Sequence, residues 1–203
     1  MRDLLRDLMD AADRRADYAD VRHVRLREEA IAMRNGELDE LDSHDEEGFG
    51  VRVQLGGGWG FAAARGSNRA AAEDALERAL ALAAAQPRRA GRALAREPAA
   101  TGRYASPTAT DPFTVSLDDK LTLLAAADSA LRADPGVTVA LAQIQSRSEH
   151  KLFASTDGAL CEQRFTECGG GISATAVHGD DAQTRSYPAS HGGNVAQRAG
   201  STC

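Results

Sequence analysis

Histidines, cysteines and carboxylates are the residues of this chain that could do chemistry, and their spacing decides which chemistry is open to them. A metal-binding helix carries two histidines on one face, with an acid between them to act on water. No two histidines of this chain have that spacing, because all five are scattered along the sequence: His23, His44, His150, His178 and His191.

The phrase from His44 to Glu47, His-Asp-Glu-Glu, comes closest to a metalloprotease motif. It falls in a predicted hairpin, however, and no second histidine lies near it in the sequence. Cys161 and Cys168 are an odd number of positions apart on a predicted strand, so a regular strand points them to opposite faces and they cannot share a metal. We therefore expect no catalytic, metal-binding or cofactor-binding residue in this chain. If zinc were found, His178 and His191 would be the first residues to re-examine.

Acidic side chains gather along the same predicted hairpin. Such a run of charge is normally a solvated strand edge that discourages pairing with other chains. The alternative is a recognition edge for a basic peptide or a partner subunit. The members of the cluster are Asp39, Glu40, Asp42, Asp45, Glu46 and Glu47.

The acidic residues lie within a predicted series of strands joined by tight turns, over residues 18–64. Asn35-Gly36 suits a two-residue type I′ turn, because both central residues of that turn need positive φ. A glycine run at 56–58 then turns the chain from one alternating apolar stretch into the next. A second antiparallel meander is predicted over 137–187, with Asp157-Gly158 as its two-residue turn.

Helices are expected before, between and after these strands. Apolar residues recur at helical spacing over 4–12, 72–83 and 117–131. Ser67 or Asn68 can cap the second helix, and Ser116 with Asp119 resembles a capping box in which Asp replaces Glu.

The fold class that follows is α+β, with helices packed on antiparallel β-meanders. Residues 86–112 contain Pro, Gly, Arg and Ala without a period, so they form a connector. This predicts residues 1–85 as helix, meander and helix, and residues 113–203 as a helix with a second meander. Similar spacing of the turn glycines in the two parts suggests two similar halves.

Whole phrases of the chain resemble the N-terminal region of the TldD/PmbA family of zinc metallopeptidases, once described as modulators of DNA gyrase. The resemblance covers roughly residues 1–193. It rests on the phrases EGFGVRV and GWGFAA at 47–63, LDDKLTLL at 117–124, FASTDG at 153–158 and RSYPASHGG at 185–193.

The resemblance implies a peptidase that acts on small, unfolded peptides and forms homo- or heterodimers with a family member. In that family, zinc is bound by a His-Glu-x-x-x-His helix in the C-terminal half, and this sequence contains no such motif. We therefore expect the non-catalytic N-terminal part of a metallopeptidase, a truncated product without the catalytic domain and without activity in isolation. The alternative is a stand-alone peptide-binding or subunit-assembly module without proteolysis.

Charge and composition exclude some classes of binding partner. A net charge of −6 argues against a nucleic-acid surface, which needs a basic face to neutralise phosphates. No apolar run is long enough to span a membrane, and the charged N-terminus lacks a signal-peptide core. Three cysteines without disulfide-framework spacing fit a reducing compartment. We expect a cytoplasmic protein that has neither nucleic-acid nor membrane partners.

Overall fold

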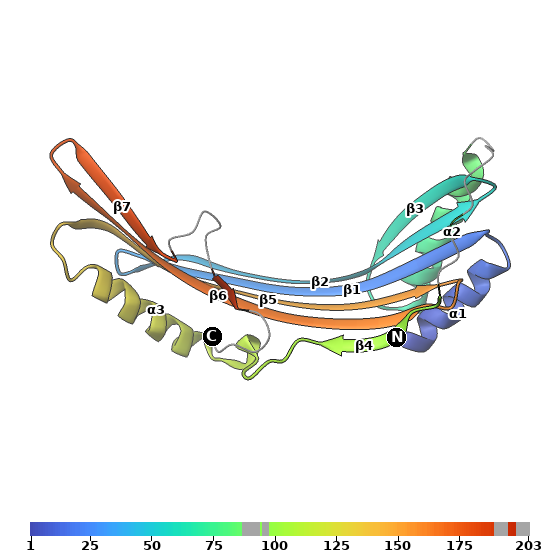
Figure 1. Ribbon diagram of the computed structural model, residues 1–203, viewed down its shortest axis with the longest axis horizontal. Helices are drawn as coiled ribbons and strands as arrows, with labels where there is room; N and C mark the ends of the chain where they lie inside the picture. The colour runs from blue at the N-terminus through green and yellow to red at the C-terminus, as the bar shows by residue number, and fades with distance from the viewer. Residues whose placement is uncertain (87–93, 95–97, 189–194, 198–203) are drawn as a thin grey trace. The chain divides into compact units, whose positions relative to one another are not determined.

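The computed structural model describes residues 1–86, 94, 98–188 and 195–197 (Figure 1). Strands are long, and helices are few. In chain order, the elements are α1 (Arg2–Asp13), β1 (Tyr18–Arg34), β2 (Glu37–Leu55), β3 (Gly58–Arg65), α2 (Arg69–Ala85), β4 (Thr101–Ala105), the short 3₁₀ helix η1 (Pro112–Thr114), α3 (Leu117–Leu131), β5 (Val137–Ser155), β6 (Leu160–His178), β7 (Asp181–Tyr187) and β8 (Val195–Gln197).

The described strands form one sheet in the order β3-β2-β1-β5-β6-β4, and β7 and β8 also pair with β6. Pairing is antiparallel between β2 and β3 and between β6 and β7. The α+β prediction is therefore confirmed. The short strand β4 was not predicted: it lies inside the expected connector and pairs in parallel with β6. The similarity of two halves stays a prediction.

Two of the hairpin turns have the left-handed backbone that their sequences require. Asn35 and Gly36 adopt φ values of 52° and 85°, so the two-residue turn between β1 and β2 is confirmed. Gly56 and Gly57 adopt 58° and 81° and join β2 to β3 in the same way.

The prediction of a two-residue turn at Asp157-Gly158 is wrong, although a hairpin is present. The loop has four residues, because β5 ends at Ser155 and β6 begins at Leu160. Gly158 N donates to Ser155 O at 3.0 Å, and only Gly158 has positive φ, at 89°. This is the pattern of a type I turn followed by a left-handed glycine. The hydroxyl of Thr156 also accepts from Ala19 N at 3.0 Å, which ties the loop to β1.

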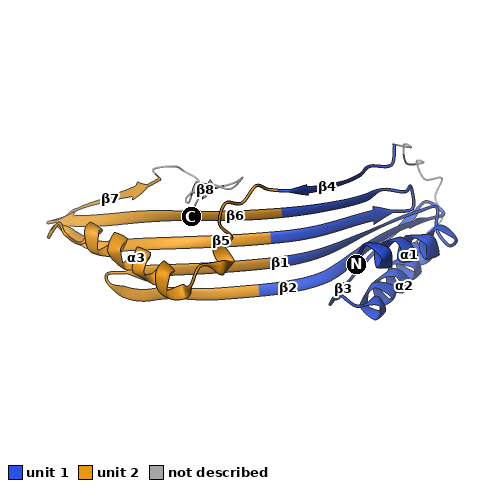
Figure 2. Ribbon diagram, turned by 90° about the horizontal axis from the view of Figure 1, so that it is seen from below, with its two compact units in different colours: residues 1–26, 45–105, 149–164 blue, residues 27–44, 106–148, 165–203 orange. Residues whose placement is uncertain are grey.

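The chain divides into two compact units (Figure 2). Unit 1 comprises residues 1–26, 45–105 and 149–164, and unit 2 comprises residues 27–44, 106–148 and 165–203. Each unit thus takes segments from both parts of the sequence. The sequential division at residues 86–112 stays a prediction, and part of that range lies outside the described residues.

Unit 1 contains the larger core, where α1 and α2 pack on the sheet. The predicted stripes of both helices are buried, and Asn68 caps α2 as expected by accepting from Ala71 N at 2.9 Å. Alanines on α2 let the helix approach β3 closely: a Cβ added at Gly60 would lie 2.0 Å from Ala79 O. The main buried side chains are Leu5, Leu8, Phe49, Val51, Val53, Leu76 and Leu152.

Unit 2 has a smaller core under α3, built from Ile31, Leu124 and Ala142. Ser116 caps α3 and also donates its hydroxyl to Asp119 at 2.6 Å. The predicted capping box is thus formed with a changed geometry, since the short aspartate binds the hydroxyl. None of the helices in the described part of the chain has the length and apolar character needed to cross a bilayer.

Candidate functional site

The histidines are the first candidates for a metal centre. His23 and His150 lie in unit 1 and His44 in unit 2, each beside a carboxylate, while His178 ends β6 and His191 lies outside the described residues. Within residues 1–86, 94, 98–188 and 195–197, no group of three potential ligands is placed to hold a metal ion. The described residues therefore do not fit a zinc ion.

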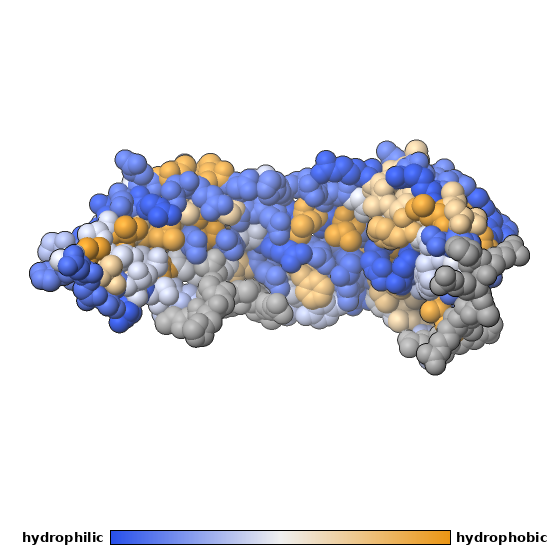
Figure 3. All heavy atoms as spheres, turned by 90° about the horizontal axis from the view of Figure 1, so that it is seen from above, coloured by the Kyte–Doolittle hydropathy of each residue, from blue (hydrophilic) through white to orange (hydrophobic). Residues whose placement is uncertain are grey.

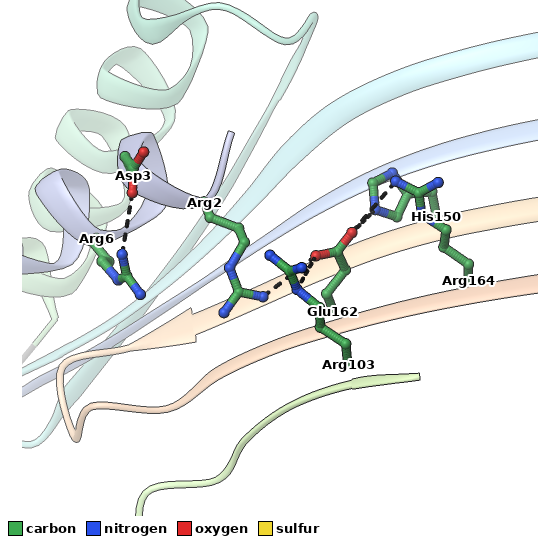
Figure 4. A network of polar contacts seen from close by, with 7 residues as sticks. All are labelled: Arg2, Asp3, Arg6, Arg103, His150, Glu162 and Arg164. Atoms are coloured by element: carbon green, nitrogen blue, oxygen red, sulfur yellow. Dashed lines mark hydrogen bonds and ion pairs between the residues drawn. The ribbon is translucent and has the colours of Figure 1, made fainter. Parts of the chain in front are cut away.

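A cluster of cations surrounds one carboxylate in unit 1, that of Glu162 on β6 (Figure 4). Its side chain is only 14% exposed. Burial by itself would raise the pKa of Glu162, but hydrogen bonds from His150 and Arg2 and the charge of Arg103 outweigh it and lower that pKa. The closest distances are 3.0 Å to His150, 3.2 Å to Arg103, 3.4 Å to Arg2 and 3.5 Å to Arg164. A carboxylate held this way ties elements together and is poorly suited to act as a base.

His23 is the second buried titratable group of unit 1. The residue is 3% exposed, and its ring lies 4.8 Å from the Phe49 ring. Nε2 lies 3.0 Å from Glu47 Oε1, but neither ring nitrogen has a hydrogen bond of good geometry with the described residues. Burial lowers the pKa of His23, and the positive charge of nearby His150 lowers it further. The negative charge of Glu47 raises this pKa, but burial is the largest effect. The ring is therefore held neutral.

A fully buried carboxylate, Asp20, organises arginines and aromatic rings in the same unit. Asp20 accepts from Arg52 at 2.6 Å and lies 3.3 Å from Arg22. Arg52 also stacks over Trp59, 5.5 Å from the ring centroid. Burial, followed by the charge of Asp20, raises the pKa of Tyr18 to about 12. These charges are satisfied inside the unit.

Unit 2 contains a different kind of feature, an open sheet edge. β3 pairs with β2 only from Gly48 to Leu55, and β1 occupies the other side of β2. Residues Glu37–His44, which we call the open edge, therefore have no strand on their outer side among the described residues (Figure 2). All of these residues are exposed. Backbone N–H and C=O groups on this side are free to pair with an added strand.

The acidic cluster of the sequence divides between the two units. In unit 1, Asp45 binds Arg25 at 2.8 Å and Glu46 binds Arg65 at 2.6 Å. Glu47, also in unit 1, lies 3.0 Å from His23. The other three members, Asp39, Glu40 and Asp42, lie on the open edge. Between Glu37 and His44 the sequence has four carboxylates and no lysine or arginine.

A cavity of about 450 Å³ lies in unit 2 beside this edge. Asp42 and His44 contribute to its wall, and they are 2.8 Å apart. Charged side chains from neighbouring strands also line it, among them Glu28, Glu29, Arg147 and Glu167. Its wall is therefore rich in carboxylates.

Sequence reasoning found the acidic residues but missed what makes them a site. The short length of β3, 8 residues against 19 for β2, leaves the edge open. The arginines around Glu162 come from α1, β4 and β6, so no local motif could have revealed them.

Family models match two ranges of this chain. Residues 19–83 match PmbA/TldA metallopeptidase domain 1, and residues 110–201 match the PmbA/TldA metallopeptidase central domain. A metalloprotease of Methanothermobacter thermautotrophicus is 46% identical over 55 residues, which is 27% of this chain and 12% of that protein.

Solved structures share the fold. A proposed modulator of DNA gyrase from Bacteroides thetaiotaomicron gives a TM-score of 0.76 at 16% identity, covering 91% of this chain and 43% of that one. TldE from Thermococcus kodakarensis gives 0.73 at 12% identity, covering 90% and 42%. This chain thus spans less than half the length of these relatives. With both domain models matched in order, the chain belongs to the PmbA/TldD family.

Proposed function

We propose that this chain supplies the non-catalytic domain 1 and central domain of a PmbA/TldD metallopeptidase acting on small unfolded peptides, and that it holds an extended peptide by strand pairing. The observation that carries this proposal is the open edge, Glu37–His44. Eight exposed residues are longer than a typical strand, so one peptide segment can pair along the whole edge.

The chemistry of hydrolysis belongs, in this proposal, to another part of the whole protein. The sequence has no His-Glu-x-x-x-His motif, and the described residues bring no three ligands together. We expect the purified chain to retain no stoichiometric zinc after zinc loading and dialysis and to cleave no peptide. Metal analysis checks this, and one tightly held zinc per chain with chelator-sensitive cleavage would contradict it.

Strand pairing can be tested with a neutral, fluorescently labelled octapeptide in which threonine alternates with glutamine. We expect saturable binding, measured by fluorescence anisotropy. A matched peptide N-methylated at two consecutive central residues loses one donor from each of its edges, so it should bind markedly more weakly. Equal binding of the two peptides, or no binding of either, would overturn the proposal.

A second candidate function, subunit assembly, is favoured by two aromatic side chains on β3 in unit 1. Trp59 and Phe61 are 39% and 62% exposed and lie two residues apart, on one face of the strand. Figure 3 displays a face on which hydrophobic residues lie in separate patches among hydrophilic ones. Exposed apolar groups of this kind often mark contacts with other proteins.

Sedimentation analysis tests this second candidate. We expect the wild-type chain to self-associate or to bind a full-length family member, and the double substitution Trp59→Ser with Phe61→Ser to weaken that association. The pair Leu82→Ser with Leu123→Ser, also exposed but on helices, is the matched control. A wild-type chain that stays monomeric and binds no family member would contradict the assembly role.

A further inference from the structure

We propose that the segment pairing with the open edge is basic, with lysine or arginine at the alternate positions that lie opposite Glu40 and Asp42. This inference rests on the proposed function and adds the chemical class of the peptide. The edge supplies backbone groups that bind any extended chain, and the side chains of the edge select among such chains.

The charges of the open edge are only partly neutralised within the protein. Arg34 binds Asp39 at 3.0 Å, and His44 lies 2.8 Å from Asp42 but is charged only when protonated. Glu37 and Glu40 have no ion pair with any residue that the structure describes. A cation on an added strand would therefore meet carboxylates that have no competing partner.

A second copy of the same edge is a poor occupant. When two open edges pair in antiparallel fashion, residues of equal parity lie opposite each other, because the same alternate residues carry the outward N–H and C=O groups in both copies. The two central registers therefore place Glu40 opposite Glu40 or opposite Asp42. Like charges directly opposite each other destabilise a strand pair, whereas opposite charges stabilise it. The occupant that the edge favours is a segment of opposite charge.

The neighbouring cavity can accommodate a long cationic side chain of the paired segment. Its volume is about 450 Å³, and Asp42, on the open edge, forms part of its wall together with Glu28 and Glu167. Glu28 is 3.4 Å from Arg147, and Glu29, also in the wall, is paired with Lys120, so two of the carboxylates already have cations. A lysine or arginine opposite Asp42 could extend its alkyl stem over this wall and place its charge among the carboxylates.

The test compares three labelled octapeptides on the full chain: threonine alternating with lysine, with glutamine and with glutamate. We expect the lysine peptide to bind about tenfold more tightly than the glutamine peptide at low salt, a difference of about 1.4 kcal/mol. The glutamate peptide should bind most weakly. Raising the salt concentration should reduce the preference, because exposed charge pairs are screened.

Charge reversal on the protein tests the same point from the other side. The double substitution Glu40→Lys with Asp42→Lys should make the glutamate peptide the tighter ligand. Asp10→Lys with Asp13→Lys changes the net charge equally on the outer face of α1 and is the matched control, expected to keep the lysine preference.

Equal affinity for the lysine and glutamine peptides, unchanged by reversal at Glu40 and Asp42, would overturn the charge inference while leaving strand pairing intact. Loss of the lysine preference in the Asp10 and Asp13 control would overturn it too, since net charge alone would then explain binding. A wild-type chain that buries the open edge in a dimer would show that a second copy is the occupant, against the inference. Failure of the neutral peptide to bind would count instead against the proposed function.

Discussion

The buried carboxylates of unit 1 and those of the open edge in unit 2 serve opposite purposes. Unit 2 also has buried pairs of its own, Asp128 with Arg132 at 2.7 Å and Glu29 with Lys120. In unit 1, Asp20 is fully buried and bound by Arg52, and Glu162 is surrounded by arginines and a histidine. In unit 2, Glu37 and Glu40 stand exposed on a strand edge with no ion pair among the described residues. The difference separates charge that holds a fold together from charge that remains available to a partner. It predicts that substitutions in unit 1 affect stability and those on the open edge affect binding.

The largest effect is expected where unit 1 is packed most closely. Gly60→Ala places a Cβ within 2.0 Å of Ala79 O and 2.6 Å of Ala83 N, both backbone atoms of α2. Because the helix must move away, we expect the free energy of unfolding to fall by roughly 3 kcal/mol, measured by urea denaturation. Gly102→Ala on β4 is the control, since nothing lies within 4 Å of its added Cβ. Similar losses in both variants would contradict the close packing of α2 on β3.

Asp20→Asn should have the next largest effect. The substitution removes the charge that binds Arg52 and Arg22, while both guanidinium groups keep access to water, at 45% and 47% exposure. We expect a loss of about 2 kcal/mol, below the usual cost of breaking a fully buried pair. Asp45→Asn, which breaks an exposed pair with Arg25, should cost less than about 1 kcal/mol in the same experiment. An equal cost for both would remove the distinction between buried and exposed charge in unit 1.

The pH dependence of stability should come partly from His23. Burial lowers the pKa of His23 in the folded chain, so the unfolded chain takes up a proton more readily as the pH falls below about 6.5. Stability is therefore fully present above that pH and decreases on acidification towards the folded pKa. His23→Leu should flatten this part of the stability curve between pH 7.5 and 5, whereas His44→Gln, at an exposed site, should not. A wild-type curve no steeper than that of His23→Leu would contradict a buried neutral ring.

The smallest effect on stability is expected at the open edge. Glu37→Gln and Glu40→Gln should change the free energy of unfolding by less than about 0.5 kcal/mol, because neither side chain is buried or paired within the described chain. The same substitutions should weaken binding of the lysine peptide. Destabilisation of 1 kcal/mol or more would show that these carboxylates serve the fold, as those of unit 1 do.

Most of the fold could be predicted from short stretches of neighbouring residues. Asn35-Gly36 requires positive φ, the apolar stripe of α1 has helical spacing, and Asn68 and Ser116 cap their helices, so each could be identified from a few neighbouring residues. The prediction of a two-residue turn at Asp157-Gly158 was wrong, since the loop has four residues, and the hydroxyl of Thr156 in this loop accepts from Ala19 N on β1, far away in the sequence. Non-local contacts of this kind leave no local trace.

For the candidate site too, local features could be predicted from the sequence, and features that depend on distant parts of the chain could not. The acidic residues of β2 were visible in the sequence, but their role depends on where β3 stops pairing, which is a property of the sheet. β4 could not be predicted either, since its five exposed residues have no buried face to produce an alternating pattern. Charge could be read from the sequence, and the partners of each charge could not.

Hydrogen exchange on the peptide complex tests the central claim most directly. Addition of the lysine octapeptide should slow exchange of backbone amides within residues 37–44, because the outward N–H groups gain strand partners. Residues 58–65 of β3, in unit 1, should be unaffected and serve as the internal reference. Protection confined to 37–44, and absent with the N-methylated peptide, is the result this account predicts. Saturated binding with no protection at 37–44 would contradict it.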